Sequence, residues 1–264
     1  MIRIYAVLLV LLTEFVKAQD IHYSQFDQTK SLINPALIFN QTEDYQIQLQ
    51  RRSQWASVTT PFNTFSLSFN AKNIYKTFVA GTTILNDKAG DSHFLTKGVI
   101  FSLANSVFNS KGNVLSIGLQ GSFYQRTINY DGLIFLEPEY FQISKVNFFD
   151  IGLGLSNYKE LADKSAFLLG ASVYHLNRPR QSFLLDRQVL LFPKYIVHSV
   201  YYVDLNSKIN FSPAAYFSSQ SQDNELIMGS GLTYKLSNQV DLHSGIYTRI
   251  KDSFIITLGM QKSN

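Results

Sequence analysis

The sequence contains no cysteine, a single tryptophan and few charged side chains. Without cysteine, the chain cannot form disulfide bonds, thiolate metal sites or a cysteine nucleophile. Charged residues make up 16% of the 264 residues, whereas ordinary soluble domains carry about 25%. Past the first residues, no apolar run approaches the roughly 20 residues that a membrane-spanning helix requires. These deficits exclude a disulfide-stabilised scaffold and a helical membrane protein.

Aromatic residues, in contrast, are abundant, with 21 Phe and 15 Tyr. So much apolar surface excludes an intrinsically disordered chain. The formal net charge is +4, and the positive residues are spread along the sequence. A small excess without clusters gives little reason to expect a nucleic-acid partner, and we predict none.

The first 18 residues have the order of an export signal. Arg3 supplies a positive charge, residues 4–12 form an apolar stretch, and residues 16–18 resemble a small-residue cleavage site. Cleavage there would leave a mature chain beginning at Gln19, with no cysteine to carry a lipid anchor. We therefore predict a signal peptide over residues 1–18 and an exported protein.

From residue 45 onward, apolar and polar residues alternate along the chain. Tyr45, Ile47 and Leu49, for example, alternate with glutamines. Such alternation places one face of a strand against an apolar medium and the other against polar atoms or water. The pattern predicts strands at 45–53, 64–73, 77–86, 94–106, 114–125, 147–158, 165–175, 196–206, 207–217, 225–235, 240–249 and 253–262.

Two all-β architectures fit this pattern, a soluble sandwich and a membrane barrel. The predicted strands have about ten residues, which suits a tilted membrane-crossing strand better than a sandwich strand of about five or six. Their polar faces are rich in Gly, Ser, Gln and Asn, and the longest connections, 126–146 and 176–195, both follow odd-numbered strands. We therefore predict an antiparallel transmembrane outer-membrane β-barrel of about 12 strands, with 14 as the alternative. Lipid leaves no partner for unpaired backbone groups, so we expect the barrel to be closed.

This interpretation divides the chain into a signal peptide (1–18), a periplasmic N-terminal segment (19–44) and the barrel (45–264). Such a segment can lie in the barrel lumen or contact periplasmic partners. We expect Asn34-Pro35 to form a fixed turn that docks the segment to the barrel, because proline disfavours helix at the residue before it.

Residue patterns typical of catalysis or metal binding are scarce. The five histidines lack the spacing of a site with three or four convergent ligands, and the sequence has no G-x-S-x-G nucleophile elbow. Glycines two residues apart, as at 152 and 154, are typical of a strand face that lacks side chains at these positions, rather than of a nucleotide site. The 87–91 loop fits a tight turn better than a calcium site. We predict a non-enzyme with no metal and no cofactor, in which histidines such as His175 and His198 make polar contacts.

The 176–195 connection is the strongest binding candidate, because it combines cations with large apolar side chains, as protein-recognition surfaces do. Folding into the lumen as a plug is an equal alternative. Trp55 is either an interfacial anchor or a loop contact. The partner-binding candidates are Arg178, Arg180, Phe183, Leu185, Arg187, Phe192, Lys194 and Trp55.

The predicted mature chain opens with Gln-Asp-Ile-His-Tyr-Ser-Gln-Phe at 19–26, and Asn-Pro-Ala-Leu follows at 34–37. These segments resemble the QDPHFSQF and LNPA motifs of the PorP/SprF family of type IX secretion membrane proteins, with Ile21 in place of the usual proline. The residues that carry this N-terminal motif are Gln19, Asp20, His22, Ser24, Gln25, Asn34 and Pro35. Further resemblances are Gln54-Trp55, 86–90, 116–121, Glu137-Pro138, 149–152, 173–176 and 191–195 followed by His198.

The resemblance implies an outer-membrane protein that works with the type IX secretion and gliding machinery. It implies three kinds of partner: periplasmic and outer-membrane secretion components, the lipid bilayer, and a large secreted adhesin with a C-terminal sorting domain. The chain could be the general component or an adhesin's dedicated partner, and its shortness favours the latter. Two other functions stay open, an outer-membrane channel for small apolar or amphipathic solutes and a secreted soluble sandwich or lectin.

Overall fold

The computed structural model describes residues 23, 25–57, 60–75, 77–90, 94–130, 143–161, 164–183, 189–237 and 239–262. Within these ranges, three short helical segments precede the strands: η1 (Phe26–Gln28), α2 (Lys30–Ile33) and η2 (Pro35–Asn40). The strands are β1 (Tyr45–Gln54), β2 (Phe62–Ala71), β3 (Val79–Ala89), β4 (Phe94–Ser110), β5 (Asn113–Thr127), β6 (Lys145–Glu160), β7 (Ser165–Tyr174), β8 (Lys194–Asp204), β9 (Ile209–Gln220), β10 (Asp223–Ser237), β11 (Val240–Arg249) and β12 (Ser253–Lys262).

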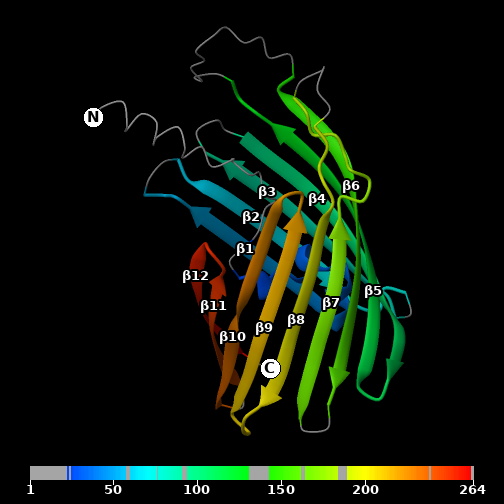
Figure 1. The fold of residues 1–264 in the computed structure, drawn as a ribbon. Coiled ribbons are helices and arrows are strands. Elements are labelled where there is room, and N and C mark those ends of the chain that lie inside the picture. The colour runs from blue at the N-terminus through cyan, green and yellow to red at the C-terminus, as the bar shows by residue number, and fades with distance from the viewer. Residues whose placement is uncertain are drawn as a thin grey trace.

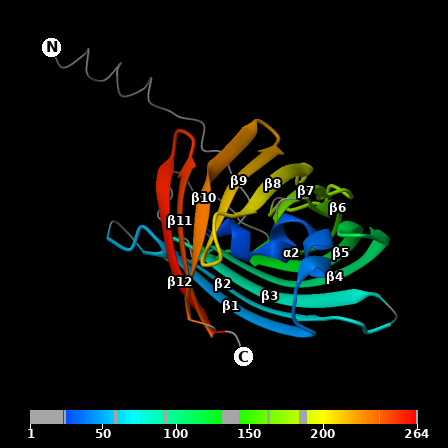
Figure 2. The same cartoon turned by 90° about the horizontal axis from the view of Figure 1, so that it is seen from below.

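All strands belong to one 12-stranded antiparallel sheet, in which each strand pairs with the next along the chain. The predicted all-β architecture with 12 strands is confirmed. The sheet curls around the helical segments in the shape of a barrel (Figures 1 and 2). This curled sheet, β1 to β12, is called the wall below. Over the described ranges no ladder joins β12 to β1, so these two strands form the edges of the sheet.

The two faces of the wall differ as the alternation predicts. On β2, Leu67 is 38% exposed on the outside, whereas its neighbour Ser66 is 1% exposed on the inside. The same division continues in β5, where Ile117 and Leu119 face outward and Ser116 is fully buried. Apolar side chains outside and polar side chains inside are the arrangement of a barrel surrounded by lipid. Strands β7, β9 and β11 also place large side chains, Leu168, Tyr216 and Tyr247, on the inside. In the part of the chain that the structure describes, no helix is long and apolar enough to cross a membrane.

Each predicted strand overlaps an observed one, with boundaries shifted by a few residues. One difference concerns a connection, between β8 and β9, where the prediction runs one strand directly into the next. The structure instead has a turn at 205–208. Asn206 Oδ1 accepts hydrogen bonds from the backbone N–H groups of Lys208 and Ile209, at 2.8 and 2.9 Å. A side chain that bonds its own backbone in this way stabilises a turn that alternation does not reveal.

The connections distinguish the two ends of the wall. At one end, here the loop end, strands are joined by the long connections 128–144 and 175–193. At the opposite end, the turn end, strands are joined by short connections such as 111–112 and 205–208. The two ends of the sheet therefore differ in the length of their connections, which are long at the loop end and short at the turn end.

Residues 25–44, here the interior segment, cross the space inside the wall. Tyr23 is buried at the loop end near the charges of Arg52 and Asp87. The ring of Phe26 packs on Tyr216 and Tyr247, at centroid distances of 5.6 and 5.4 Å. The segment then leads to the start of β1 at the turn end, and Figure 2 shows its helices enclosed by the sheet.

Candidate functional site

The turn at Asn34 is the most completely buried part of the interior segment, and the Asn34 side chain has no exposed surface. Its Nδ2 donates to the carbonyl oxygens of Leu155 and Ala171, at 2.9 and 3.2 Å, and lies 3.1 Å from Nε2 of His198. Its Oδ1 accepts from the backbone N–H of Ala36 at 2.9 Å and caps η2, which begins with Pro35. One side chain thus joins the segment to β6, β7 and β8.

Three glycines on neighbouring strands make room for this turn. A Cβ at Gly118 would collide with the backbone of Pro35 and Ala36, and one at Gly154 with the Asn34 side chain. At Gly170, a Cβ would meet the side chains of His198 and Asn34. Gly118 and Gly154 face each other across the β5–β6 ladder. The wall therefore has a recess that is shaped to the turn.

Polar side chains of the wall bind the carbonyl groups that precede the turn. Gln120 Nε2 and the Tyr174 hydroxyl donate to the carbonyl oxygen of Ser31, at 2.9 and 3.2 Å. Ser172 Oγ donates to the carbonyl oxygen of Ile33 at 2.5 Å. Buried carbonyl groups need such donors, so these contacts hold the interior segment in one position.

A cavity of about 300 Å³ lies between the interior segment and the loop end. Its lining combines apolar side chains, such as Leu32 and Leu85, with charged and polar groups, several of which form contacts with one another. Thr64 Oγ1 donates to Asp87 at 2.6 Å, and His175 Nδ1 lies 3.0 Å from Asp150 Oδ2. The guanidinium of Arg126 lies over the ring of Phe148, 5.2 Å from its centroid. Arg52 and Lys194 complete the charged lining.

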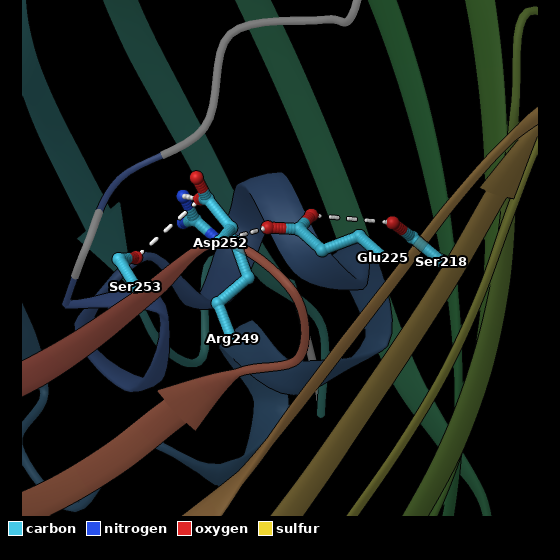
Figure 3. Close-up of polar contacts among 5 residues, drawn as sticks. All are labelled: Ser218, Glu225, Arg249, Asp252 and Ser253. Atoms are coloured by element: carbon cyan, nitrogen blue, oxygen red, sulfur yellow. Dashed lines mark hydrogen bonds and ion pairs between the residues drawn. The ribbon is translucent and has the colours of Figure 1, made fainter.

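A second polar cluster ties the last hairpins together at the loop end (Figure 3). Arg249 forms ion pairs with Glu225, at 2.7 Å from its Nε, and with Asp252, at 2.8 Å from its Nη1. The hydroxyls of Ser218 and Ser253 donate to Glu225 and Asp252, each at 3.4 Å. Strands β9 and β10 are thereby joined to the β11–β12 hairpin.

The described parts of the 175–193 connection, residues 175–183 and 189–193, pair with each other at the loop end. Arg180 and Leu190 form an antiparallel bridge, and Leu191 N–H donates to the carbonyl oxygen of Pro179 at 2.9 Å. Leu191 is buried against the loop-end cavity, whereas Phe192 is 48% exposed. The exposed guanidinium of Arg178 lies over the Phe192 ring, 5.4 Å from its centroid. Among the described residues of the connection, His175 and Leu191 therefore face the cavity, whereas Arg178, Arg180 and Phe192 are exposed.

The remaining predicted site residues are spread more widely. Phe183 packs edge-on against Phe94 at 6.0 Å, and Lys194 begins β8 and lines the loop-end cavity. Trp55 lies in the β1–β2 connection, 61% exposed and edge-on to Phe62 at 4.9 Å, whereas Gln25 is exposed just before η1. Outside the described residues lie Leu185, Arg187, Gln19, Asp20, His22 and Ser24.

Comparison with known proteins assigns the chain to a family. The profile described as type IX secretion system membrane protein PorP/SprF matches residues 15–264. The chain belongs to the PorP/SprF family. No curated protein matches the chain. The resemblance of the sequence motifs to PorP/SprF proteins is thereby confirmed, and it extends over the interior segment and all twelve strands.

Several important residues of this PorP/SprF protein were missed by sequence reasoning. Lys30, Arg52 and Arg126 line cavities, and Gly118 and Gly170 shape the recess for the turn. Arg52 and Arg126 did carry a signal, because they are charges on the polar face of alternating strands. The described residues contain no group of three or more His, Cys, Asp or Glu that could hold a metal ion.

Proposed function

We propose that this chain is an outer-membrane component of the type IX secretion and gliding machinery, and that it supports secretion and surface retention of a large partner adhesin. The observation that carries the proposal is the family match over residues 15–264. Membership places the chain among membrane proteins of type IX secretion. The adhesin, with its C-terminal sorting domain, and the contacts with periplasmic and outer-membrane secretion components are the proposed part.

The proposed location rests on the wall and on the start of the chain. Apolar side chains cover the outside of the strands, which suits contact with a lipid bilayer. A signal peptide over residues 1–18 would export the chain to the periplasm, from which barrels enter the outer membrane; these residues lie outside the described part. By the usual orientation of outer-membrane barrels, the loop end faces the cell exterior.

The surface proposed for partner contact is the exposed side of the 175–193 connection. Arg178, Arg180 and Phe192 are exposed there, and Phe183 of the same connection is half-buried. Arginine and aromatic side chains are enriched where proteins recognise one another. The buried Leu191 anchors the connection, so the exposed groups have a stable base.

The experiment is deletion of the gene followed by complementation with variants. We expect deletion to remove a large adhesin with a C-terminal sorting domain from the cell surface, measured by antibody labelling of intact cells. The triple variant Arg178→Ala/Arg180→Ala/Phe192→Ala should reduce surface adhesin while the barrel remains at normal abundance. The control Lys111→Ala/Lys164→Ala, which removes exposed charges at the turn end, should restore it fully. An unchanged adhesin level after deletion would contradict the proposal.

A further inference from the structure

A second and larger cavity, of about 510 Å³, lies on the other side of the interior segment, toward the turn end. Its walls are mostly apolar. Ile33 and Leu37 line it from the segment, and Leu168, Val200 and Tyr202 line it from strands β7 and β8. Its volume lies within the range of about 300–1,000 Å³ that is typical of small-molecule sites.

One cation, Lys30, contributes to this apolar lining. Its side chain is half-buried, and among the described residues no carboxylate lies within 4.0 Å of its ammonium group. Burial lowers the pKa of Lys30, and the nearby charge of Lys72 acts in the same direction. Asp27 acts in the opposite direction, but it is exposed and forms no ion pair with Lys30.

An ammonium group in an apolar cavity is unfavourable unless an anion accompanies it. Among the described residues, no carboxylate supplies such an anion within 4.0 Å of the Lys30 ammonium group, although Asp27 lines the same cavity. The cavity has space for an anion beside Lys30. Besides Lys30, the lining includes the imidazole of His198, whose Nε2 lies 3.1 Å from Asn34 Nδ2, and the exposed carboxylate of Asp27. The apolar remainder can accommodate a hydrocarbon chain. The lining therefore matches a ligand with one negative charge and a long apolar part.

We infer that this cavity binds a single-chain anionic amphiphile, whose head group pairs with Lys30 and whose acyl chain lies along Leu37, Leu168 and Val200. Free fatty acids and lysophospholipids share this chemistry and differ in the head group, carboxylate or phosphate. The inference does not depend on the proposed role in adhesin secretion, because it rests on the cavity and its one cation.

The test uses the full mature chain in nanodiscs of zwitterionic phosphatidylcholine, which has no net charge. Binding of radiolabelled palmitate and of lysophosphatidylglycerol is measured at equilibrium, with empty nanodiscs subtracted. We expect saturable binding of at least one of these anions at one site per chain. The anion that binds more tightly shows whether the ligand is a fatty acid or a lysophospholipid. Hexadecanol, which has a similar chain but no charge, should bind about tenfold more weakly or worse.

Four variants distinguish the effect of the Lys30 charge from the effects of cavity shape and of positive charge elsewhere at the turn end. Lys30→Gln should weaken anion binding about tenfold or more, whereas Lys30→Arg should retain most of it. Val200→Phe should block binding by filling the cavity without removing the charge. Lys164→Gln, which removes an exposed cation at the same end, should bind like the unmodified chain.

Folding of each variant is checked by the heat-dependent gel mobility that barrels show. Absence of saturable anion binding to the unmodified chain would overturn the inference. So would equal binding of hexadecanol, or full binding by a folded Lys30→Gln variant.

Discussion

Gly154 lies where the interior segment comes closest to the wall, since a Cβ at this position would overlap the Asn34 side chain. We predict that Gly154→Ala displaces the turn at Asn34 and destabilises the protein by about 1–3 kcal/mol, the usual cost of overpacking a dense interior. The displaced segment should expose Lys30 to trypsin, and mass spectrometry of the digest would detect cleavage there. Gly259→Ala is the matched control, because its Cβ would meet no atom nearer than 3.8 Å. Equal digestion of the two variants would contradict the prediction.

Asn34 permits a second prediction at the same scale. Asn34→Ala leaves two part-buried carbonyl groups, those of Leu155 and Ala171, without the Nδ2 donor, and it leaves the backbone N–H of Ala36 without its Oδ1 acceptor. We expect a loss of about 1–3 kcal/mol in the free energy of unfolding, the cost of buried groups left unsatisfied. Urea unfolding in phosphatidylcholine vesicles would measure the change. The control Asn109→Ala lies on an exposed part of β4 and should change stability by less than about 0.5 kcal/mol.

At the scale of elements, the strands were predictable because lipid and interior impose opposite demands on successive residues. Leu67 outside and Ser66 inside show this demand directly. The short helices were not predictable, because they have no periodicity of their own and depend on distant contacts. The turn after α2, for instance, is held by a bond from Asn34 to Ala171, 137 residues away. Local pattern therefore determines the wall, whereas tertiary contacts determine what lies inside it.

The candidate sites divide in the same way. The 176–195 connection could be selected from composition alone, because cations and aromatics are concentrated within it. The glycine pair 152 and 154 was interpreted as a strand face that lacks side chains, but sequence could not show what Gly154 makes room for. That depends on strand register, which places Gly118 opposite Gly154 and Gly170 opposite His198. The sequence around Lys30 did not indicate a binding site. The absence, among the described residues, of a carboxylate within 4.0 Å and the apolar surroundings of Lys30 arise only when the chain folds.

At the scale of the whole molecule, the interior segment divides the space inside the wall. Phe26 packs on β9 and β11, whereas Asn34 bonds to β6 and β7 and approaches His198 on β8. Residues of η2 also contact β3, β4 and β5. The segment therefore touches most of the wall, with a charged cavity toward the loop end and an apolar one toward the turn end.

This division leads to a prediction about conduction. We expect the full chain in a planar bilayer to show no steady ion conductance, because the interior segment and its bonds to β6 and β7 separate the two cavities. A variant lacking residues 25–41 should open a steady channel, because the side chains that fill the space between the two cavities would be absent. Gly154→Leu, which keeps the chain length but displaces the turn, should give intermittent openings, and Gly259→Ala should remain closed.

Steady conductance by the unmodified chain would contradict the separation of the two cavities by the interior segment. It would instead favour the alternative function, an outer-membrane channel for small solutes. Closure of both the full chain and a folded deletion variant would show that the wall itself, rather than the segment, blocks the path.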